Sequence, residues 1–133
     1  MSYSQEWLLK DHVLYIKISN PYTDDDVVNS SNSVVTDFNT SSQPVFLIVN
    51  TLGITSFPKN IVRAIPSVQK FMTHANLRQL IVISDNPSIK FVSMLATQVQ
   101  RNKVILHTTL DEALAYIGKQ VPEIASQLTK LRD

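Results

Sequence analysis

The sequence predicts an α/β fold: a mostly parallel sheet with an N-terminal β-hairpin and with helices packed on it. From residue 45 onward, short apolar runs of strand composition alternate with longer segments of helical periodicity. Consecutive strands separated by helices require crossover connections, which make neighbouring strands parallel. A length of 133 residues is typical of one domain, so we assign residues 1–133 to a single unit.

The predicted hairpin lies at the start of the chain. The runs "EWLL" and "VLYIKIS" flank the polar residues "KDH", which can turn the chain between two strands. Leu14, Ile16 and Ile18 occupy every second position of the second run. This period of two indicates a strand with one well-buried face.

A helix is expected to begin after Thr23. The Thr23 hydroxyl can accept a hydrogen bond from an unpaired amide, and Asp24, Asp25 and Asp26 complement the positive end of the helix dipole. The same acids could instead form a cation site, but a helix N-terminus favours acids in any case. The inward stripe at helical spacing comprises Val27, Val28, Val34, Val35 and Phe38.

The central strand and the next helix follow. "VFLIVN" is apolar without alternation, which indicates a strand covered on both faces. Beyond the following loop, Pro58 suits a first helical turn, whereas Pro66 should kink or break the helix near its middle. The expected inward stripe comprises Ile61, Val62, Ile65, Val68 and Met72.

Two further strands and three helical segments complete the chain. "LRQLIVISD" and "KVILHT" have strand composition, and a helix is predicted between them over residues 86–102. Thr109 and Glu112 have the spacing of a capping box. An additional C-terminal helix is expected at about residues 121–132, with Ile124, Leu128 and Leu131 on one face.

The composition restricts the function classes. Lys plus Arg number 12 against 11 for Asp plus Glu, so no long-range field favours nucleic acid or an anionic membrane. The chain contains no cysteine, and we expect no disulfide, zinc–thiolate site or thiol nucleophile. The opening "MSYSQEWLLKDH" lacks signal-peptide features and no apolar run is long enough to insert into a membrane, so we expect a cytoplasmic protein.

No constellation of catalytic or cofactor-binding residues is evident. His12, His74 and His107 are scattered, with no metal-ligand spacing between them. The only glycines are Gly53 and Gly118, too few for a glycine-rich phosphate cradle. We therefore expect no enzyme activity, no cofactor and no bound metal.

Two groups of side chains could serve binding. Lys59, Arg63 and Lys70 share one side of a predicted helix, either as a solvated face or as a surface for an acidic partner. Aromatic residues could line a small apolar pocket, although packing in the core is their commoner role. These residues are Tyr3, Trp7, Phe57, Phe71 and Phe91.

The element order and several phrases resemble the STAS superfamily, the anti-sigma-factor antagonist fold, and in particular its SpoIIAA-like branch. The similar phrases are "VLYIKISNPYTDDDVV", "PVFLIVNTLGITSFP", "RQLIVISDNPSIKFVSMLATQV" and "VILHTTLDEALAYI". The resemblance covers a core of about residues 7–117 and implies a βα superhelix that binds a regulatory protein. In phosphorylated members, the loop after the central strand carries an acid, hydroxyl residues and a glycine.

Here the matching phrase is Ile54 to Pro58, with no acid before the hydroxyls and no glycine after them. The resemblance implies Thr55 and Ser56 as candidate phosphorylation sites, while local structure gives Ser56 a role as a helix cap. The expected partner surface comprises Thr51, Thr55, Ser56, Phe57, Lys59, Arg63 and Lys70. The resulting hypothesis is a non-catalytic protein-binding module in intracellular signalling.

The alternative hypothesis is a carrier of a small apolar or lipid-like ligand, held in a cavity lined by residues such as Phe57, Phe71 and Phe91. Homodimerisation through the terminal helix or a sheet edge is left open by the sequence.

Overall fold

The computed structural model describes residues 2–55, 61–85 and 103–132, which form an α/β fold around a mixed five-stranded sheet. The strands lie in sequence order: β1 (Tyr3–Leu9), β2 (Val13–Ser19), β3 (Val45–Gly53), β4 (Leu77–Ile83) and β5 (Val104–His107). β1 pairs with β2 in antiparallel fashion, and β2 through β5 are parallel. The predicted hairpin and the predicted parallel strands are therefore confirmed.

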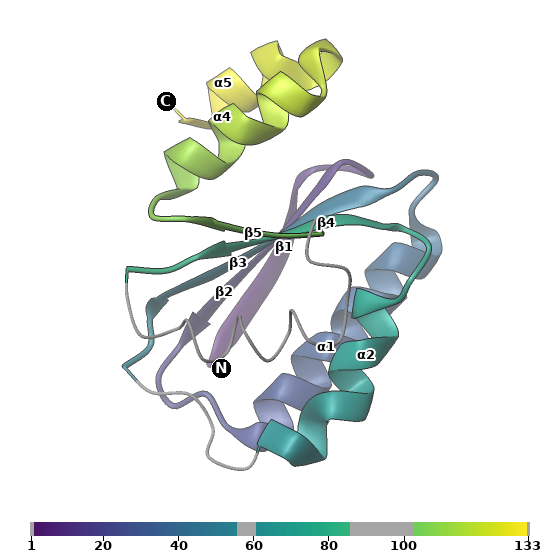
Figure 1. The fold of residues 1–133 in the computed structure, drawn as a ribbon, viewed down its shortest axis with the longest axis vertical. Helices are drawn as coiled ribbons and strands as arrows, with labels where there is room; N and C mark the ends of the chain where they lie inside the picture. Colours follow the sequence, from purple (N-terminus) through teal and green to yellow (C-terminus); the bar gives the residue numbers. More distant parts are fainter. Residues whose placement is uncertain (1, 56–60, 86–102, 133) are drawn as a thin grey trace.

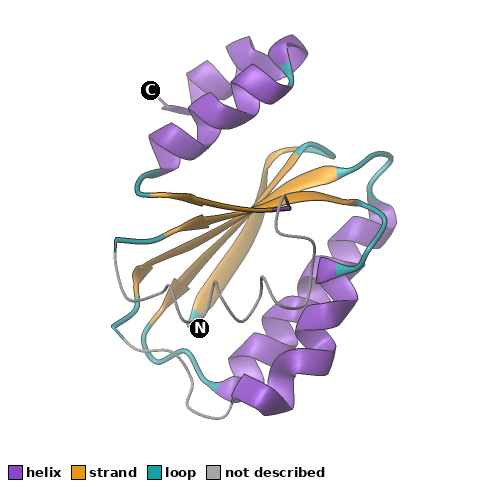
Figure 2. Cartoon of the chain, in the orientation of Figure 1, coloured by secondary structure: helices purple, strands orange, loops and turns teal. Residues whose placement is uncertain are grey.

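Helices cover both faces of the sheet (Figures 1 and 2). On one face, α1 (Asp24–Thr40) lies beside α2 (Ile65–Met72), which follows the 3₁₀ turn η1 (Ile61–Ala64). On the other face, α4 (Leu110–Gln120) packs with η3 (Pro122–Ile124) and α5 (Ala125–Arg132). Right-handed crossovers between consecutive parallel strands bring their helices to the same face, which accounts for the shared position of α1 and α2.

The alternation of side chains along each strand divides the core into two clusters. In β2, Leu14 and Ile16 face α1 and α2, whereas Val13 faces α4 and α5. In β3, Leu47 and Ile48 point into opposite clusters and neither is exposed to solvent. The run "VFLIV" is apolar at every position because both faces of this strand are covered.

Helix α1 starts as the sequence predicts. The Thr23 hydroxyl accepts a hydrogen bond from the Asp26 amide at 3.2 Å, and the Asp26 carboxylate accepts from the Thr23 amide at 2.9 Å. This reciprocal pair is a capping box. Val27, Val34 and Phe38 are buried, as expected, and Val28 and Val35 are partly buried against the same cluster.

The second helical segment differs in part from the prediction. Pro66 does fall at a break, because η1 ends at Ala64 and α2 begins at Ile65, which places the proline in the first turn of a new helix. Val68 and Met72 are buried, but Val62 is 70% exposed, so its assignment to the inward stripe is wrong. Ala64 and Phe71 are buried on this side of the sheet instead, because the change from 3₁₀ to α geometry alters the period.

The C-terminal elements confirm most of their predicted features. Thr109 caps α4 by accepting from the Glu112 amide at 3.1 Å, but the Glu112 carboxylate accepts from the Thr108 hydroxyl at 2.6 Å rather than from the Thr109 amide. The predicted box is therefore incomplete. Ile124 and Leu128 are buried, but Leu131 is exposed. The helix predicted over residues 86–102 lies outside the described residues.

Candidate functional site

The four parallel strands end together at one edge of the sheet. We call this the carboxyl edge and define it as residues 19–23, 51–55, 84–85 and 107–109. Open α/β sheets usually place binding sites at such an edge, because the loops there are free to vary while the strands hold them in position. Of the predicted partner surface, Thr51 and Thr55 lie at this edge, and Arg63 and Lys70 follow in η1 and α2.

Two hydrogen bonds join the loops after β2 and β3. The Asn20 side-chain amide donates to the Thr55 hydroxyl at 3.2 Å, and the Asn20 side-chain carbonyl accepts from the Thr55 amide at 3.3 Å. Both residues are exposed. This reciprocal pair, which we call the Asn20–Thr55 clamp, fixes the backbone of one loop against the side chain of the other.

An ion pair forms a second link to the start of α1. The Arg63 guanidinium donates to the Asp25 carboxylate at 3.1 Å, which ties η1 to the first turn of α1. The two side chains are 64% and 75% exposed, so solvent screens the pair and its contribution to stability is small. Its main effect is on the local charge. The helix that carries Arg63 offers it no acidic neighbour in the predicted cationic group, whereas the structure places Asp25 of α1 beside it.

Thr51, which the sequence predicts as a partner-binding residue, lies inside the sheet. Its side chain is buried in β3, with 3% exposed, and its hydroxyl donates to the Ile83 carbonyl oxygen of β4 at 2.7 Å. The hydroxyl therefore bridges two strands within the sheet. Nearby Asn50 is also buried, and its side chain donates to the Tyr15 hydroxyl and accepts from the Leu52 amide.

The other predicted site residues have different outcomes. Thr55, Arg63 and Lys70 are exposed, and they lie respectively after β3, in η1 and in the last turn of α2. The predicted helix cap Ser56 lies outside the described residues, as do Phe57 and Lys59 of the predicted surface.

Of the three acids at the start of α1, Asp26 acts as a helix-capping group. Although partial burial opposes ionisation, hydrogen bonds from the Ser2 hydroxyl and from Thr23 hold the pKa of Asp26 below its usual value. A shallow polar depression, lined by Ser2, Asn20, Pro21, Thr23 and Asp26, lies at this corner. Within the ranges described, no group of three or more His, Cys, Asp or Glu side chains is arranged to hold a metal ion.

The lowered pKa of Asp26 predicts a defined pH dependence. A carboxylate whose folded pKa is depressed stabilises the fold above its unfolded pKa of about 3.9, and the effect is lost as the pH falls through the folded value. Asp26→Asn should therefore flatten the acid limb of the stability–pH curve below pH of about 4. Urea unfolding monitored by circular dichroism between neutral and acidic pH measures this, and an unchanged acid limb would contradict the assignment.

The three histidines have separate partners on separate elements. His12 contacts Gln43, His74 contacts Asn39 and Asn76, and the ring of His107 packs on Tyr116. In these contacts, each histidine is paired with a residue other than a histidine.

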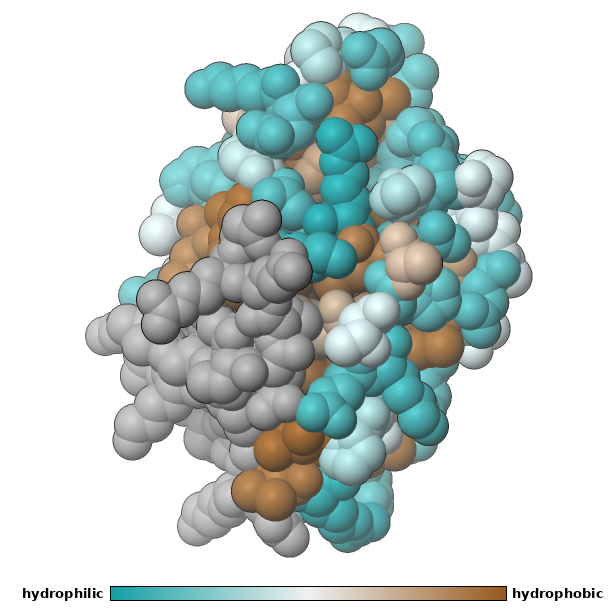
Figure 3. All heavy atoms as spheres, turned by 45° about the vertical axis from the view of Figure 1, so that its right-hand side comes forward, coloured by the Kyte–Doolittle hydropathy of each residue, from teal (hydrophilic) through white to brown (hydrophobic). Residues whose placement is uncertain are grey.

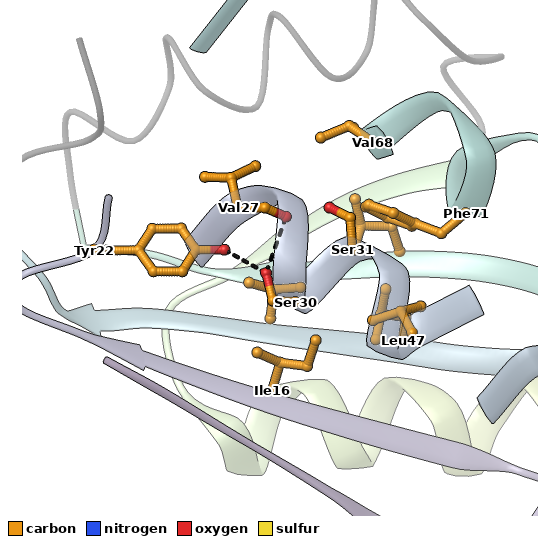
Figure 4. Close-up of a pocket in the computed structure, with 11 residues that line it drawn as sticks. Ile16, Tyr22, Val27, Ser30, Ser31, Leu47, Val68 and Phe71 are labelled. Atoms are coloured by element: carbon orange, nitrogen blue, oxygen red, sulfur yellow. Dashed lines mark hydrogen bonds between the residues drawn. The ribbon is translucent and has the colours of Figure 1, made fainter. Parts of the chain in front are cut away.

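A small cavity lies between α1, α2 and the sheet (Figure 4). Its volume is about 30 Å³, and its walls are mainly apolar, with Phe71 of α2 and Leu47 of β3 among them. Tyr3 and Trp7 pack against the same core cluster rather than forming this wall. Of the aromatic residues that the sequence proposes for a pocket, Phe71 is placed in one, and Phe57 and Phe91 lie outside the described residues.

Tyr22 closes one side of this cavity. Its hydroxyl is hydrogen-bonded to the Ser30 hydroxyl at 2.8 Å, and Ser30 in turn donates to the Val27 carbonyl oxygen at 3.2 Å. Burial raises the pKa of Tyr22 to about 12. Ser30 and Ser31 are each 4% exposed, although the sequence suggests only poor helix formers at these positions.

The raised pKa of Tyr22 predicts a late step in an alkaline titration. Because an unfolded tyrosine ionises near about 10, the stability that Tyr22 contributes should be present below that pH and be lost toward pH of about 12. Ultraviolet absorbance of tyrosinate should show one group ionising at about 12. Tyr22→Phe should remove this late step, and its persistence in the variant would refute the assignment.

Exposed apolar side chains are few and separated. On the face shown in Figure 3, hydrophilic residues cover most of the described surface and hydrophobic residues form small patches between them. The large exposed hydrophobic residues in the described ranges are Leu52, Val62, Leu106 and Leu131. Of the helices in those ranges, none combines the length and apolar character needed to cross a bilayer.

Comparison with known proteins returned no match to a family model, to a curated protein or to a solved structure. The sequence did not single out Asn20, and it assigned Asp25 only to helix capping or a cation site, not to a pair with Arg63. Asn20 could have been found, since it follows a parallel strand directly, whereas the pairing of Asp25 with Arg63 spans 38 residues.

Proposed function

We propose that this protein is a non-catalytic module of STAS-like fold that binds a regulatory protein partner at its carboxyl edge. The observation that carries the proposal is the Asn20–Thr55 clamp together with the Arg63–Asp25 pair. These links hold exposed polar groups of separate loops in one arrangement before any partner arrives. Preorganisation of this kind reduces the entropy lost on binding and so favours recognition.

The sheet topology supports the STAS-like part of the proposal. An antiparallel hairpin is followed by parallel strands in sequence order, with α1 and α2 on one face, as a βα superhelix requires. Similar architecture is a weak warrant for function, because one fold serves many roles. The proposed binding function therefore rests on the geometry of the carboxyl edge.

The charges at this edge change the expected chemistry of the partner. Arg63 is paired with Asp25, and Asp24 and Asp26 stand beside it in the first turn of α1. The predicted uniform cationic stripe is thus interrupted by an acid from another element. We propose a partner surface with mixed polarity that can hydrogen-bond to Asn20 and Thr55, in place of a purely acidic one.

The Arg63–Asp25 pair can be tested without a partner. Arg63→Asp places a like charge beside Asp25 and should lower the unfolding free energy by about 0.2–1 kcal/mol, the range of exposed pairs. The swapped variant, Asp25→Arg with Arg63→Asp, should recover most of this loss because the pair is rebuilt in reverse. A double-mutant cycle by urea denaturation gives the coupling, and a coupling of zero would mean that the contact does not form in solution.

Phosphorylation at Thr55 would act directly on the clamp. The Thr55 hydroxyl is exposed and accepts its hydrogen bond from Asn20. A phosphate adds close to two negative charges and three acceptor oxygens, so it would replace this neutral contact. We propose Thr55 as the regulated position within the described edge, with mass spectrometry of protein from its native host as the check.

One observation bears on the alternative function of an apolar-ligand carrier. Phe71 lines a cavity, but a volume of about 30 Å³ is far below the roughly 300–1,000 Å³ of ligand pockets. This cavity does not accommodate a lipid chain as it stands. Native mass spectrometry of freshly purified protein decides between the two functions, because copurified lipid would favour the carrier.

The direct test of the proposed function is affinity capture from the native host with matched baits. Thr55→Arg places a long cation at the carboxyl edge, and Thr40→Arg places the same group on an exposed threonine at the far end of α1. We expect wild type and Thr40→Arg to capture the same protein and Thr55→Arg to lose it. Equal capture by all three baits would exclude the clamp region as the binding surface.

A further inference from the structure

The strand β1 forms an outer edge of the described sheet, because it pairs with β2 on one side only. Its register shows which of its backbone groups face outward. The Ser19 amide of β2 donates to the Ser2 carbonyl oxygen at 2.7 Å, just before β1 begins. Bonded and outward positions alternate along an antiparallel strand, so the N–H and C=O groups of Tyr3, Gln5 and Trp7 point away from β2.

This edge has few of the features that protect sheet edges from other strands. Proteins commonly block an edge with lysine, proline, a bulge or a very short strand. β1 is seven residues long and contains neither lysine nor proline. Its pairing with β2 is regular from Tyr3 to Trp7, and the irregularity begins only after Trp7. The stretch between these residues is therefore able to pair with another strand.

A buried acceptor without a partner lies at the middle of this stretch. The Gln5 side-chain amide donates to the Asp37 carboxylate at 2.6 Å and to the Ser33 carbonyl oxygen at 3.2 Å, both on α1. The side-chain oxygen of Gln5 is buried and accepts no hydrogen bond within the described structure. Such an atom is unfavourable, because nearly all buried polar atoms have a partner. A donor from outside the chain would satisfy it.

The helix that covers this edge is uncharged along its middle. Between Asp26 and Asp37, α1 contains no charged side chain, although Asn29, Asn32 and Thr36 are exposed there. The solvent-facing side of a surface helix usually carries charged residues, whereas the centre of a protein interface is depleted of them. The composition of α1 above β1 is therefore that of a surface that can be covered.

We propose that β1 pairs in antiparallel fashion with β1 of a second copy of this chain, with Gln5 on the two-fold axis. In this register Tyr3 of each copy lies opposite Trp7 of the other, so every outward N–H and C=O group from Tyr3 to Trp7 is paired. A shift of the register in either direction leaves some of these groups unpaired. One such shift also places the two Glu6 side chains opposite each other, and their like charges repel.

The side chains of this edge complement themselves in the same register. Tyr3 and Trp7 pack on the core cluster beneath α1, so pairing brings a tyrosine against a tryptophan on both sides of the axis. The tyrosine hydroxyl and the indole N–H of the second copy are donors on the face where the Gln5 oxygen lies. On the other face, exposed Ser4 lies opposite exposed Glu6. The occupant that fits this edge is thus a second copy.

Sedimentation equilibrium of two matched variants gives the first test. Gln5→Ala and Gln5→Pro both lose the side-chain hydrogen bonds to α1, but only proline removes the outward N–H, which makes no bond to β2. We expect wild type and Gln5→Ala to sediment as dimers and Gln5→Pro to sediment as a folded monomer by circular dichroism. A monomeric wild type, or equal dimerisation of the two variants, would overturn the proposal.

Disulfide trapping locates the axis and decides the question even where the proline variant does not fold. The chain has no cysteine, so Gln5→Cys and Glu6→Cys each introduce a single thiol. Across the axis the two residues 5 have Cα atoms about 5.5 Å apart, within disulfide reach, whereas the two residues 6 are diagonal neighbours about 7–8 Å apart. Under mild oxidation we expect a covalent dimer from Gln5→Cys and little from Glu6→Cys. No cross-link in Gln5→Cys, or equal cross-linking of both, would contradict the two-fold pairing.

This pairing is independent of partner binding at the carboxyl edge, because it uses β1 and α1 and not the Asn20–Thr55 clamp. Loss of the dimer in Gln5→Pro with unchanged capture of a protein partner would support the pairing and leave the proposed function intact.

Discussion

Phe38→Ala is expected to lower the free energy of unfolding by about 3–5 kcal/mol. Phe38 is fully buried in α1, within the core cluster that joins α1 and α2 to the sheet. Its ring also lies 5.3 Å from that of His74, between ring centroids. Truncation removes apolar contacts and leaves a cavity that the surrounding strands cannot fill by relaxation.

The measurement is urea denaturation of wild type, Phe38→Ala and Phe38→Leu. Because domains of this size are stabilised by only about 5–15 kcal/mol, the alanine variant should be close to unfolding at ordinary temperature. The leucine variant retains most of the volume and should lose much less. A loss below about 1 kcal/mol in Phe38→Ala would mean that α1 does not pack on the sheet as described.

Gly53→Ala should disturb the carboxyl edge itself. A Cβ atom at residue 53 would lie 2.7 Å from the Ile18 carbonyl oxygen of β2, a contact with backbone that cannot be relieved by a side-chain rotation. The strands must separate locally, at an expected cost of about 1–3 kcal/mol. Gly53 lies two residues before Thr55, so the Asn20–Thr55 clamp should weaken with it.

Gly118→Ala is the matched control, with the opposite expected sign. The added Cβ would lie 3.4 Å from the Ala125 Cβ, which is an ordinary contact, and alanine favours the interior of α4 by up to about 1 kcal/mol over glycine. Unfolding free energies and amide hydrogen exchange at Thr55 compare the two variants. Equal stability of Gly53→Ala and wild type would contradict the close approach of β2 and β3.

Local patterns were sufficient to predict most of the architecture. The alternation around Ile16 identified a strand with one well-buried face, and the uniform run around Leu47 identified a strand covered on both sides. Thr23 and Thr109 were recognised as helix caps because capping depends on residues three positions apart. Such signals are local, so a single sequence contains them.

The candidate site was predicted less well, because its geometry depends on long-range contacts. Thr51 and Thr55 are both hydroxyl residues near the end of β3, yet one bonds to β4 inside the sheet and the other is exposed. Nothing in the local composition separates them. The acidic partner of Arg63 is likewise on another element, Asp25 of α1. A pattern of charges along one helix therefore cannot reveal this ion pair.

If the carboxyl edge recognises a protein partner, hydrogen–deuterium exchange of the complex with the captured partner should locate the contact there. We expect added protection in residues 19–25 and 52–55, with little change in α4 and α5. Protection confined to α4 and α5, or to the opposite edge of the sheet, would contradict it.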